Sequence, residues 1–191
     1  MSCTSCALHA LCHSQKASGG IHPPAAARLS VPQGAYLFRS GKPSAALYAV
    51  RSGSLKCISR EASLGPFVNR FMLPGDVTGL DGFDGGVEMS DAIALEASEV
   101  CEVPRERAQL LADTRPDVAA QLRTLASAEI LRTTAHAQIL SRRGAVSRVA
   151  GFLADLSARG NSATVIALPM GRRDIGDHLG LTIESVSRAF S

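Results

Sequence analysis

The chain has 191 residues, of which 46% are hydrophobic, enough for one large or two modest domains with a real core. Its formal net charge of +3 says little by itself about a nucleic-acid partner. No apolar run is long enough to span a bilayer and no signal segment opens the chain, so we expect a cytoplasmic protein with no membrane partner. Five cysteines, an odd number, argue against a secreted disulfide framework.

Three of the cysteines lie close together at the N-terminus. Cys3, Cys6 and Cys12 follow a C-x2-C-x5-C spacing, and Cys101 lies far away in the sequence. Three clustered thiolates and one distant thiolate match the ligand count of an iron–sulfur or zinc site. Cys57 lies in an alternating apolar run and is interpreted as a strand or core residue.

The middle of the chain has the pattern of a β-structure. Residues 13–33 are rich in Gly, Pro and Ala and predict a linker, whereas residues 34–104 alternate short apolar runs with Gly and Pro turns. This texture predicts an antiparallel barrel or sandwich. The expected strands cover 35–38, 47–50, 55–58, 68–73, 92–95 and 100–103.

Helical spacing begins after Pro116. We expect a long helix over 116–142, a second helix over Ala145–Arg159 and a short strand over 163–168. The many small residues of the long helix favour pairing with a second copy, although its apolar residues could equally pack on the chain's own β-domain. Those residues are Val118, Leu122, Leu125 and Ile130.

The last twenty residues fit a helix-turn-helix. Ile175 and Leu179 form the inner face of a first helix, Gly180 makes the turn and Thr182 caps the second helix. Leu181 is expected to fill the angle between the helices, with Val186 and Phe190 facing inward.

The second of these helices offers a polar stripe to a DNA major groove. Glu184, Ser187 and Arg188 lie at i, i+3 and i+4. A glutamate can accept from cytosine N4 and an arginine can donate to guanine, and the surrounding surplus of arginines suits phosphates. An ordinary helical hairpin with a salt-bridged face is the alternative. The candidate DNA-binding residues are Thr182, Glu184, Ser187, Arg188, Arg172 and Arg173.

The whole chain resembles the CRP/FNR family of bacterial transcription regulators, and within it the oxygen-responsive FNR branch. The resemblance rests on the cysteine motif and on four further segments. These are Leu47–Lys56, Leu73–Gly79, Val100–Pro104 and Asp174–Arg188. It implies a mixed α+β fold with a double-stranded, cupin-like β-roll sensor domain, a long dimerisation helix and a winged helix-turn-helix. The domains expected are 1–33 for cluster binding and linker, 34–115 for the β-roll, 116–143 for the dimerisation helix and 144–191 for DNA binding.

The resemblance also implies how a signal reaches DNA. Cys3, Cys6, Cys12 and Cys101 match the four positions that hold a [4Fe-4S] cluster in the FNR branch, and Glu184, Ser187 and Arg188 match the base-contacting positions for a TTGAT-type half-site. An intact cluster is expected to favour a homodimer on DNA, and its oxidative conversion to weaken that dimer. RNA polymerase is a further expected partner.

One part of the family pattern is missing at the C-terminus. The family continues past the second helix into a β-hairpin wing, whereas this sequence stops at Ser191. We therefore expect a DNA-binding domain that is incomplete, as a fragment or a truncated protein.

The signal could in principle be a cyclic nucleotide, which the same β-roll binds elsewhere in the family. Residues 79–93 contain four acids and no arginine, so a phosphate would be repelled and no cyclic nucleotide is expected. The cysteines leave a structural zinc site or unmetallated redox thiols open, and His9 and His13 are expected to be surface residues rather than ligands.

Other function classes fit the sequence less well. It has no Gly-rich phosphate loop, no Ser/His/Asp arrangement and no metal-hydrolase helix, so we do not expect an enzyme. An electron carrier would explain the cysteines but not the helix-turn-helix. A dimerising competitor without productive DNA binding remains an alternative to a full regulator.

Overall fold

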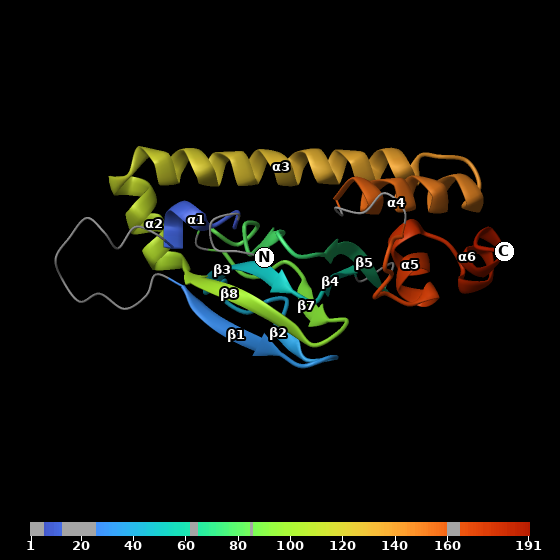
Figure 1. Ribbon diagram of the computed structural model, residues 1–191, viewed down its shortest axis with the longest axis horizontal. Coiled ribbons are helices and arrows are strands. Elements are labelled where there is room, and N and C mark those ends of the chain that lie inside the picture. The colour runs from blue at the N-terminus through green and yellow to red at the C-terminus, as the bar shows by residue number, and fades with distance from the viewer. Residues whose placement is uncertain (1–5, 13–25, 62–64, 85, 160–164) are drawn as a thin grey trace. The chain divides into compact units, whose positions relative to one another are not determined.

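The computed structural model describes residues 6–12, 26–61, 65–84, 86–159 and 165–191, with the side chains of Cys12 and Glu61 excepted. The chain divides into two compact units, Met1–Ala128 and Glu129–Ser191, and the boundary falls inside its longest helix. The first unit is a β-domain with short helices and the second is helical (Figure 1). This mixed α+β fold confirms the expected class.

Eight strands form two antiparallel sheets of four. One sheet has the order β1-β8-β3-β6 and the other the order β2-β7-β4-β5. The strands are β1 (Ala27–Val31), β2 (Tyr36–Phe38), β3 (Ala46–Ser52), β4 (Leu55–Glu61), β5 (Gly65–Met72), β6 (Val77–Thr78), β7 (Asp91–Ala94) and β8 (Ser98–Pro104).

The six strands expected from the apolar runs all exist, but the structure corrects the rest of this region. Strand β1 lies in the segment predicted as a linker, because its pairing with β8 supplies backbone hydrogen bonds that local composition does not reveal. The two-residue strand β6 and the helix α2 (Arg105–Thr114) were not expected either. In α2 only Ala108 and Leu111 are buried, so its helical apolar pattern is weak.

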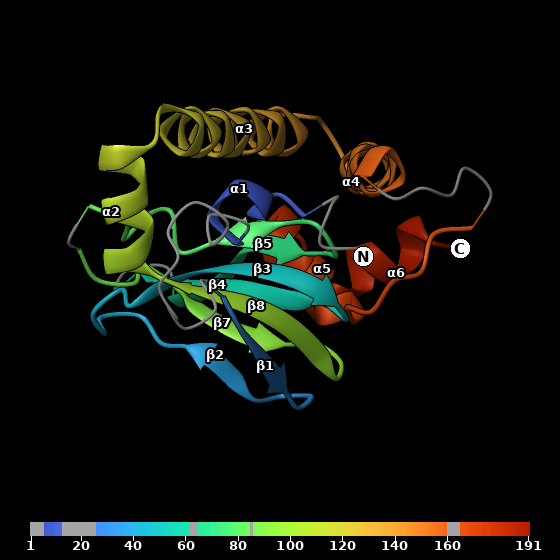
Figure 2. The same cartoon turned by 60° about the vertical axis from the view of Figure 1, so that its left-hand side comes forward.

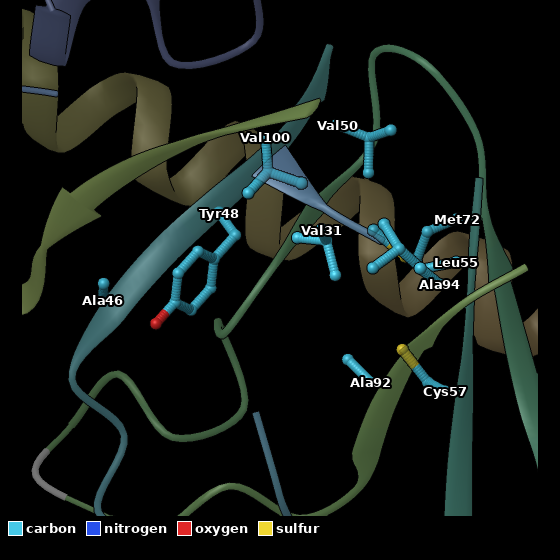
Figure 3. Packing of buried hydrophobic residues seen from close by; sticks show 10 residues of the cluster. All are labelled: Val31, Ala46, Tyr48, Val50, Leu55, Cys57, Met72, Ala92, Ala94 and Val100. Atoms are coloured by element: carbon cyan, nitrogen blue, oxygen red, sulfur yellow. The ribbon is translucent and has the colours of Figure 1, made fainter. Parts of the chain in front are cut away.

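Side chains from both sheets meet in one core cluster. Tyr48, Val50 and Val100 from one sheet pack with Leu55 and Met72 from the other (Figure 3). The sulfur of Cys57 lies within this core, next to Ala92 in Figure 3. Cys57 is 1% exposed, which confirms its interpretation as a core residue.

Strand β3 is buried on both faces, because its side chains alternate between two clusters. Tyr48 and Val50 point into the core between the sheets, whereas Leu47 and Ala49 belong to a second cluster on the outer face. Helices α1 (His9–Cys12) and α2 and the first part of α3 (Pro116–Leu140) contribute to this second cluster. Figures 1 and 2 both draw α1 between the sheet and α3.

The second unit contains the end of α3 and three more helices. They are α4 (Ala145–Arg159), α5 (Arg172–Leu179) and α6 (Ile183–Ala189). Helix α4 has the predicted bounds and buries Val149, Phe152 and Leu156 on one face. Residues 165–168 form no strand, so that prediction is wrong for them, and residues 163–164 lie outside the described part of the chain. No helix in the described residues is long and apolar enough to cross a membrane.

Candidate metal centre and DNA-binding surface

Cys101 lies in the middle of β8, between two neighbouring strands. Its backbone is in register with Arg28 of β1 and Ala49 of β3. The side chain is half-buried at the border of the outer cluster that contains Leu47, Ala49 and Val103. The thiol is therefore held on a rigid sheet and faces the side that the N-terminal segment covers.

The N-terminal segment is anchored on this same cluster by two leucines. Leu8 and Leu11 are spaced three residues apart, so they share one face of the short turn and helix, and both are 0% exposed. They pack with Val103, and Cys6 borders the same cluster. The Sγ of Cys6 also accepts a hydrogen bond from the backbone N–H of Leu8, with an N···S distance of 3.4 Å. Burial of the leucines therefore brings Cys6 and Cys101 to the border of one apolar cluster.

The other two predicted ligands cannot be placed in the same way. Cys3 lies outside the described residues, and only the backbone of Cys12 is described, as the last residue of α1. Among the described residues no group of three or more His, Cys, Asp or Glu side chains could hold a metal ion. His9 is half-buried, and His13 lies outside the described range.

Cys57 differs from the other thiols in its surroundings. Burial raises the pKa of the Cys57 thiol, and nearby Arg70 acts in the opposite direction. The thiol group is thus kept protonated inside the core, which disfavours it as a ligand or a nucleophile.

Two buried carboxyl groups lie in the segment where a cyclic phosphate would be expected. Asp91 forms an ion pair with Arg60 at 3.0 Å and accepts a hydrogen bond from the backbone N–H of Ser40. Glu88 is 2% exposed, and burial raises the pKa of its carboxyl group, with Asp81 adding to the effect. This part of the β-domain offers acceptors and negative charge rather than donors for a phosphate.

The helix-turn-helix has the predicted construction. Ile175, Leu179 and Val186 are each 0% exposed, and α5 and α6 are in contact. Gly180 adopts a left-handed conformation with φ 61° after the last residue of α5. The Oγ1 of Thr182 accepts a hydrogen bond from the backbone N–H of Ser185 at 3.2 Å, which confirms Thr182 as the N-cap of α6.

The predicted base-contacting stripe is open to solvent. Glu184, Ser187 and Arg188 are all exposed on α6. The backbone N–H of Glu184 lowers the pKa of its carboxyl group, with Thr182 and Arg188 adding to the effect, so this side chain is ionised at neutral pH. A guanidinium N–H of Arg188 points to the Oγ of Ser185 at 3.4 Å. Donors and acceptors thus lie along one exposed face of the helix.

The two arginines that begin α5 are also exposed, and one has a structural contact. The guanidinium of Arg172 lies 3.8 Å from the centre of the Phe190 ring. This cation–π contact joins the start of α5 to the end of α6. Phe190 is half-buried under it, in line with the inward position expected for this residue. Arg173 is exposed beside it.

Two residues that support the helix-turn-helix were not expected from the sequence. A Cβ atom on Gly176 would lie 2.7 Å from the carbonyl oxygen of Leu181, so only glycine lets α5 approach the turn so closely. Arg148 of α4 donates to the carbonyl oxygens of Leu179 and Arg142, at 3.0 and 3.1 Å. Their partners are distant or non-helical backbone atoms, which a sequence pattern does not show.

Comparisons with known proteins agree with this arrangement of a β-domain followed by a helix-turn-helix. Residues 28–115 match the cyclic nucleotide-binding domain family, and residues 147–191 match the Crp-like helix-turn-helix domain. The solved structure of FixK2 from Bradyrhizobium japonicum is similar to 86% of this chain and 82% of its own, with a TM-score of 0.79 and 34% identity. The fold and site thus define a DNA-binding transcription regulator, which is not an enzyme.

Sequence relatives define the family. The transcriptional activator protein anr of Pseudomonas aeruginosa is 40% identical over 163 residues, which cover 83% of this chain and 67% of that protein. The fumarate and nitrate reduction regulatory protein of Salmonella typhimurium is 37% identical over 162 residues, 83% of this chain and 65% of that protein. The chain belongs to the CRP/FNR family of bacterial transcription regulators and spans about two thirds of the length of these relatives.

Proposed function

We propose that the chain is an oxygen- or redox-responsive transcription regulator of the cytoplasm, which senses its signal through a [4Fe-4S] cluster held by Cys3, Cys6, Cys12 and Cys101. The observation that carries this proposal is the complete burial of Leu8 and Leu11 on the cluster that borders Cys101. The names of two relatives, an anaerobic regulatory protein of Pasteurella multocida and the fumarate and nitrate reduction regulatory protein, support a signal of this kind.

The residues present fit such a group by their chemistry. Cys6 and Cys101 are soft sulfur donors at the border of one apolar cluster, and Cys3 and Cys12 flank Cys6 closely in the sequence. Four thiolates suffice for a [4Fe-4S] cluster. When bound, the cluster supplies an oxygen-sensitive link between the N-terminal segment and β8.

The apolar contacts of the N-terminal segment connect this link to the long helix. Leu8 and Leu11 pack in the same cluster as Val118, with Leu122 and Leu125 beside them. Release of the N-terminal segment would expose this part of α3 to water and loosen its packing on the β-domain. The state of the four cysteines would thereby change the packing of α3 on the β-domain. We propose below that α3 also forms the dimer interface.

Two apolar side chains on the outer face of α3 support a homodimer. Ile130 is 67% exposed and Leu131 is 70% exposed. The hydroxyl groups of Thr133 and Thr134 donate to carbonyl oxygens one turn earlier in the same helix, at 3.0 Å each. Their methyl groups therefore remain available for contact beside Ile130 and Leu131, so a second copy could bury this face without leaving those hydroxyl groups unpaired.

The DNA-binding part of the proposal assigns a role to each exposed residue. Glu184, Ser187 and Arg188 contact the bases of a TTGAT-type half-site, whereas Arg172 and Arg173 contact phosphates. Thr182 holds the start of α6 in place. RNA polymerase would be a partner of the DNA-bound dimer, and the buried acids Glu88 and Asp91 argue against a cyclic nucleotide as the signal.

The test is the binding of a duplex with two inverted TTGAT-type half-sites, measured by fluorescence anisotropy with protein purified without oxygen. We expect tight binding that air abolishes, and a loss of about 5- to 150-fold for Arg188→Ala, since one bidentate base contact contributes about 1–3 kcal/mol. Arg39→Ala, which removes the same charge from the β-domain, is the matched control. Equal binding by Arg188→Ala and wild type would contradict the assigned DNA surface.

A structural zinc site on the same cysteines is the second candidate, because zinc also accepts four thiolates. Zinc has no redox chemistry, so DNA binding by a zinc-loaded protein would not change after a short exposure to air. The comparison of DNA binding before and after exposure to air therefore separates the two candidates.

A further inference from the structure

Two histidines from different helices stack on each other in the helical unit. The ring centres of His136, in α3, and His178, in α5, are 4.0 Å apart, and the planes differ by 18°. The ring of Phe152, in α4, meets His178 edge-on at 5.5 Å. Three helices of the unit thus meet at one group of aromatic rings, and neither imidazole belongs to the DNA surface or to the cysteine site.

The surroundings of His136 favour the uncharged form of its ring. His136 is half-buried, and its Nδ1 is buried with no hydrogen-bond partner in the described part of the chain. Burial lowers the pKa of His136, and Asp155 of α4 acts in the opposite direction. Asp155 is itself close to Arg159, with an N···O distance of 3.4 Å.

Two further charged residues lie one turn before the histidines on the same helices. Arg132 precedes His136 on α3 and is paired with Glu129 at 3.5 Å. Asp174 precedes His178 by one turn on α5. Two positive rings in this stack would repel each other, so binding of a second proton is disfavoured.

The position of α5 sets the position of the base-contacting helix. The backbone N–H of Leu181 donates to the carbonyl oxygen of Gly176 at 3.0 Å, and α5 and α6 are in contact. A change in how α5 packs on α3 would therefore move the start of α6. The stacked histidines form the aromatic contact between α3 and α5.

We propose that His178 is a positioning residue for α6, which it holds through its stack on His136 while the pair is uncharged, and that acidification weakens DNA binding by charging this pair. The proposal rests on the DNA-binding function given above. Because the pKa of His136 is lowered in the folded state, the folded state binds fewer protons than the unfolded one. The stabilisation is therefore present above the ordinary histidine value of about 6.5 and is lost as the pH falls through that value.

The experiment compares wild type with His136→Phe, which keeps an aromatic ring against His178 but removes the imidazole whose pKa burial lowers. DNA affinity of the full chain, purified without oxygen, is measured from pH 8 to pH 5.5, and visible absorption at each pH checks that the metal content is unchanged. We expect wild type to lose about tenfold in affinity over this range, which a pKa shift of about one unit in one group allows, and His136→Phe to lose less than about threefold. Equal losses in both proteins would overturn the proposal.

A second measurement, protein stability against urea, needs no DNA. It keeps the proposal testable even if a variant folds poorly. The urea midpoint of the full chain is measured over the same pH range for wild type, His136→Phe and His136→Tyr. Wild type should lose stability on acidification more steeply than either variant, and parallel curves would overturn the proposal. If no protein binds the duplex at any pH, the DNA-binding function fails, and these unfolding curves still decide whether the pair titrates as inferred.

Discussion

At the scale of single residues, the close approach of two backbone segments constrains which residue can stand at position 176 of the helix-turn-helix. Gly176 lies inside α5, where alanine would ordinarily be the better helix former. A Cβ atom at this position would lie 2.7 Å from the Leu181 carbonyl oxygen, a backbone atom that cannot rotate away. The turn between the helices therefore depends on a residue that intrinsic helix propensity disfavours.

Gly176→Ala should destabilise the protein by about 1–3 kcal/mol, the cost typical of an overpacked contact, and weaken DNA binding because α6 is displaced. Urea unfolding and duplex binding measure the two effects. Gly171→Ala is the matched control, since a Cβ atom on Gly171 has no neighbour within 4 Å, and it should cost about half a kcal/mol or less. Similar costs for the two variants would contradict the close approach.

Residue type and spacing predict the structural roles of some residues of the site but not of others. Thr182, Gly180, Ile175 and Leu179 could be assigned from the sequence, because a cap, a left-handed turn and an inner face each follow from residue type and spacing. Gly176 and the stacked histidines could not be assigned, because their contacts join separate helices or approach a turn. The sequence shows where the four candidate ligands are, but it does not show which side chains bring Cys6 to the sheet.

At the scale of secondary-structure elements, the short helix α1 is the connection between the cysteine motif and the β-domain. It has only four residues, so it has little stability of its own. Its position depends on Leu8 and Leu11, which pack against Val103 of β8 and Val118 of α3. The segment that carries three candidate ligands is therefore held mainly by apolar contacts.

Leu11→Ala should loosen this segment, because truncating a buried leucine costs about 2–5 kcal/mol, more than a four-residue helix can supply by itself. The expected result is faster loss of visible absorption in air and faster proteolysis near the N-terminus than in wild type. Leu110→Ala, a leucine of the same unit that is 55% exposed, is the control. Identical decay rates in Leu11→Ala and in wild type would show that α1 does not retain the metal.

The elements also show why part of the fold could not be predicted. The six expected strands carry apolar runs that are visible locally, whereas β1 is a strand because residues about seventy positions later, in β8, pair with it. Strand β6 has two residues that pair with Tyr48 and Ala49 of β3. In both cases pairing with a distant partner decides the structure, and a local pattern does not contain that information.

At the scale of the whole molecule, the long helix α3 belongs to both compact units. Its first part packs with the outer cluster of the β-domain through Val118, and its last part contributes Ile139 and His136 to the helical unit. The structure thus answers the question that the sequence left open for this helix. Val118, Leu122 and Leu125 pack on the chain's own β-domain, whereas Ile130 remains exposed.

The account as a whole depends on the four cysteines acting as one site. Cys6 and Cys101 border the same cluster, and Cys57 is separated from them in the core between the sheets. The iron and sulfide content should therefore fall when Cys101 is replaced and stay unchanged when Cys57 is replaced.

The most direct test measures iron, acid-labile sulfide and visible absorption in protein purified without oxygen, for wild type, Cys101→Ser and Cys57→Ala. We predict about four irons and four sulfides per chain in wild type and in Cys57→Ala, bleached by air in both, and loss of the cluster in Cys101→Ser. A colourless wild-type protein that carries zinc or no metal would contradict the account, and so would a Cys101→Ser protein with full iron content.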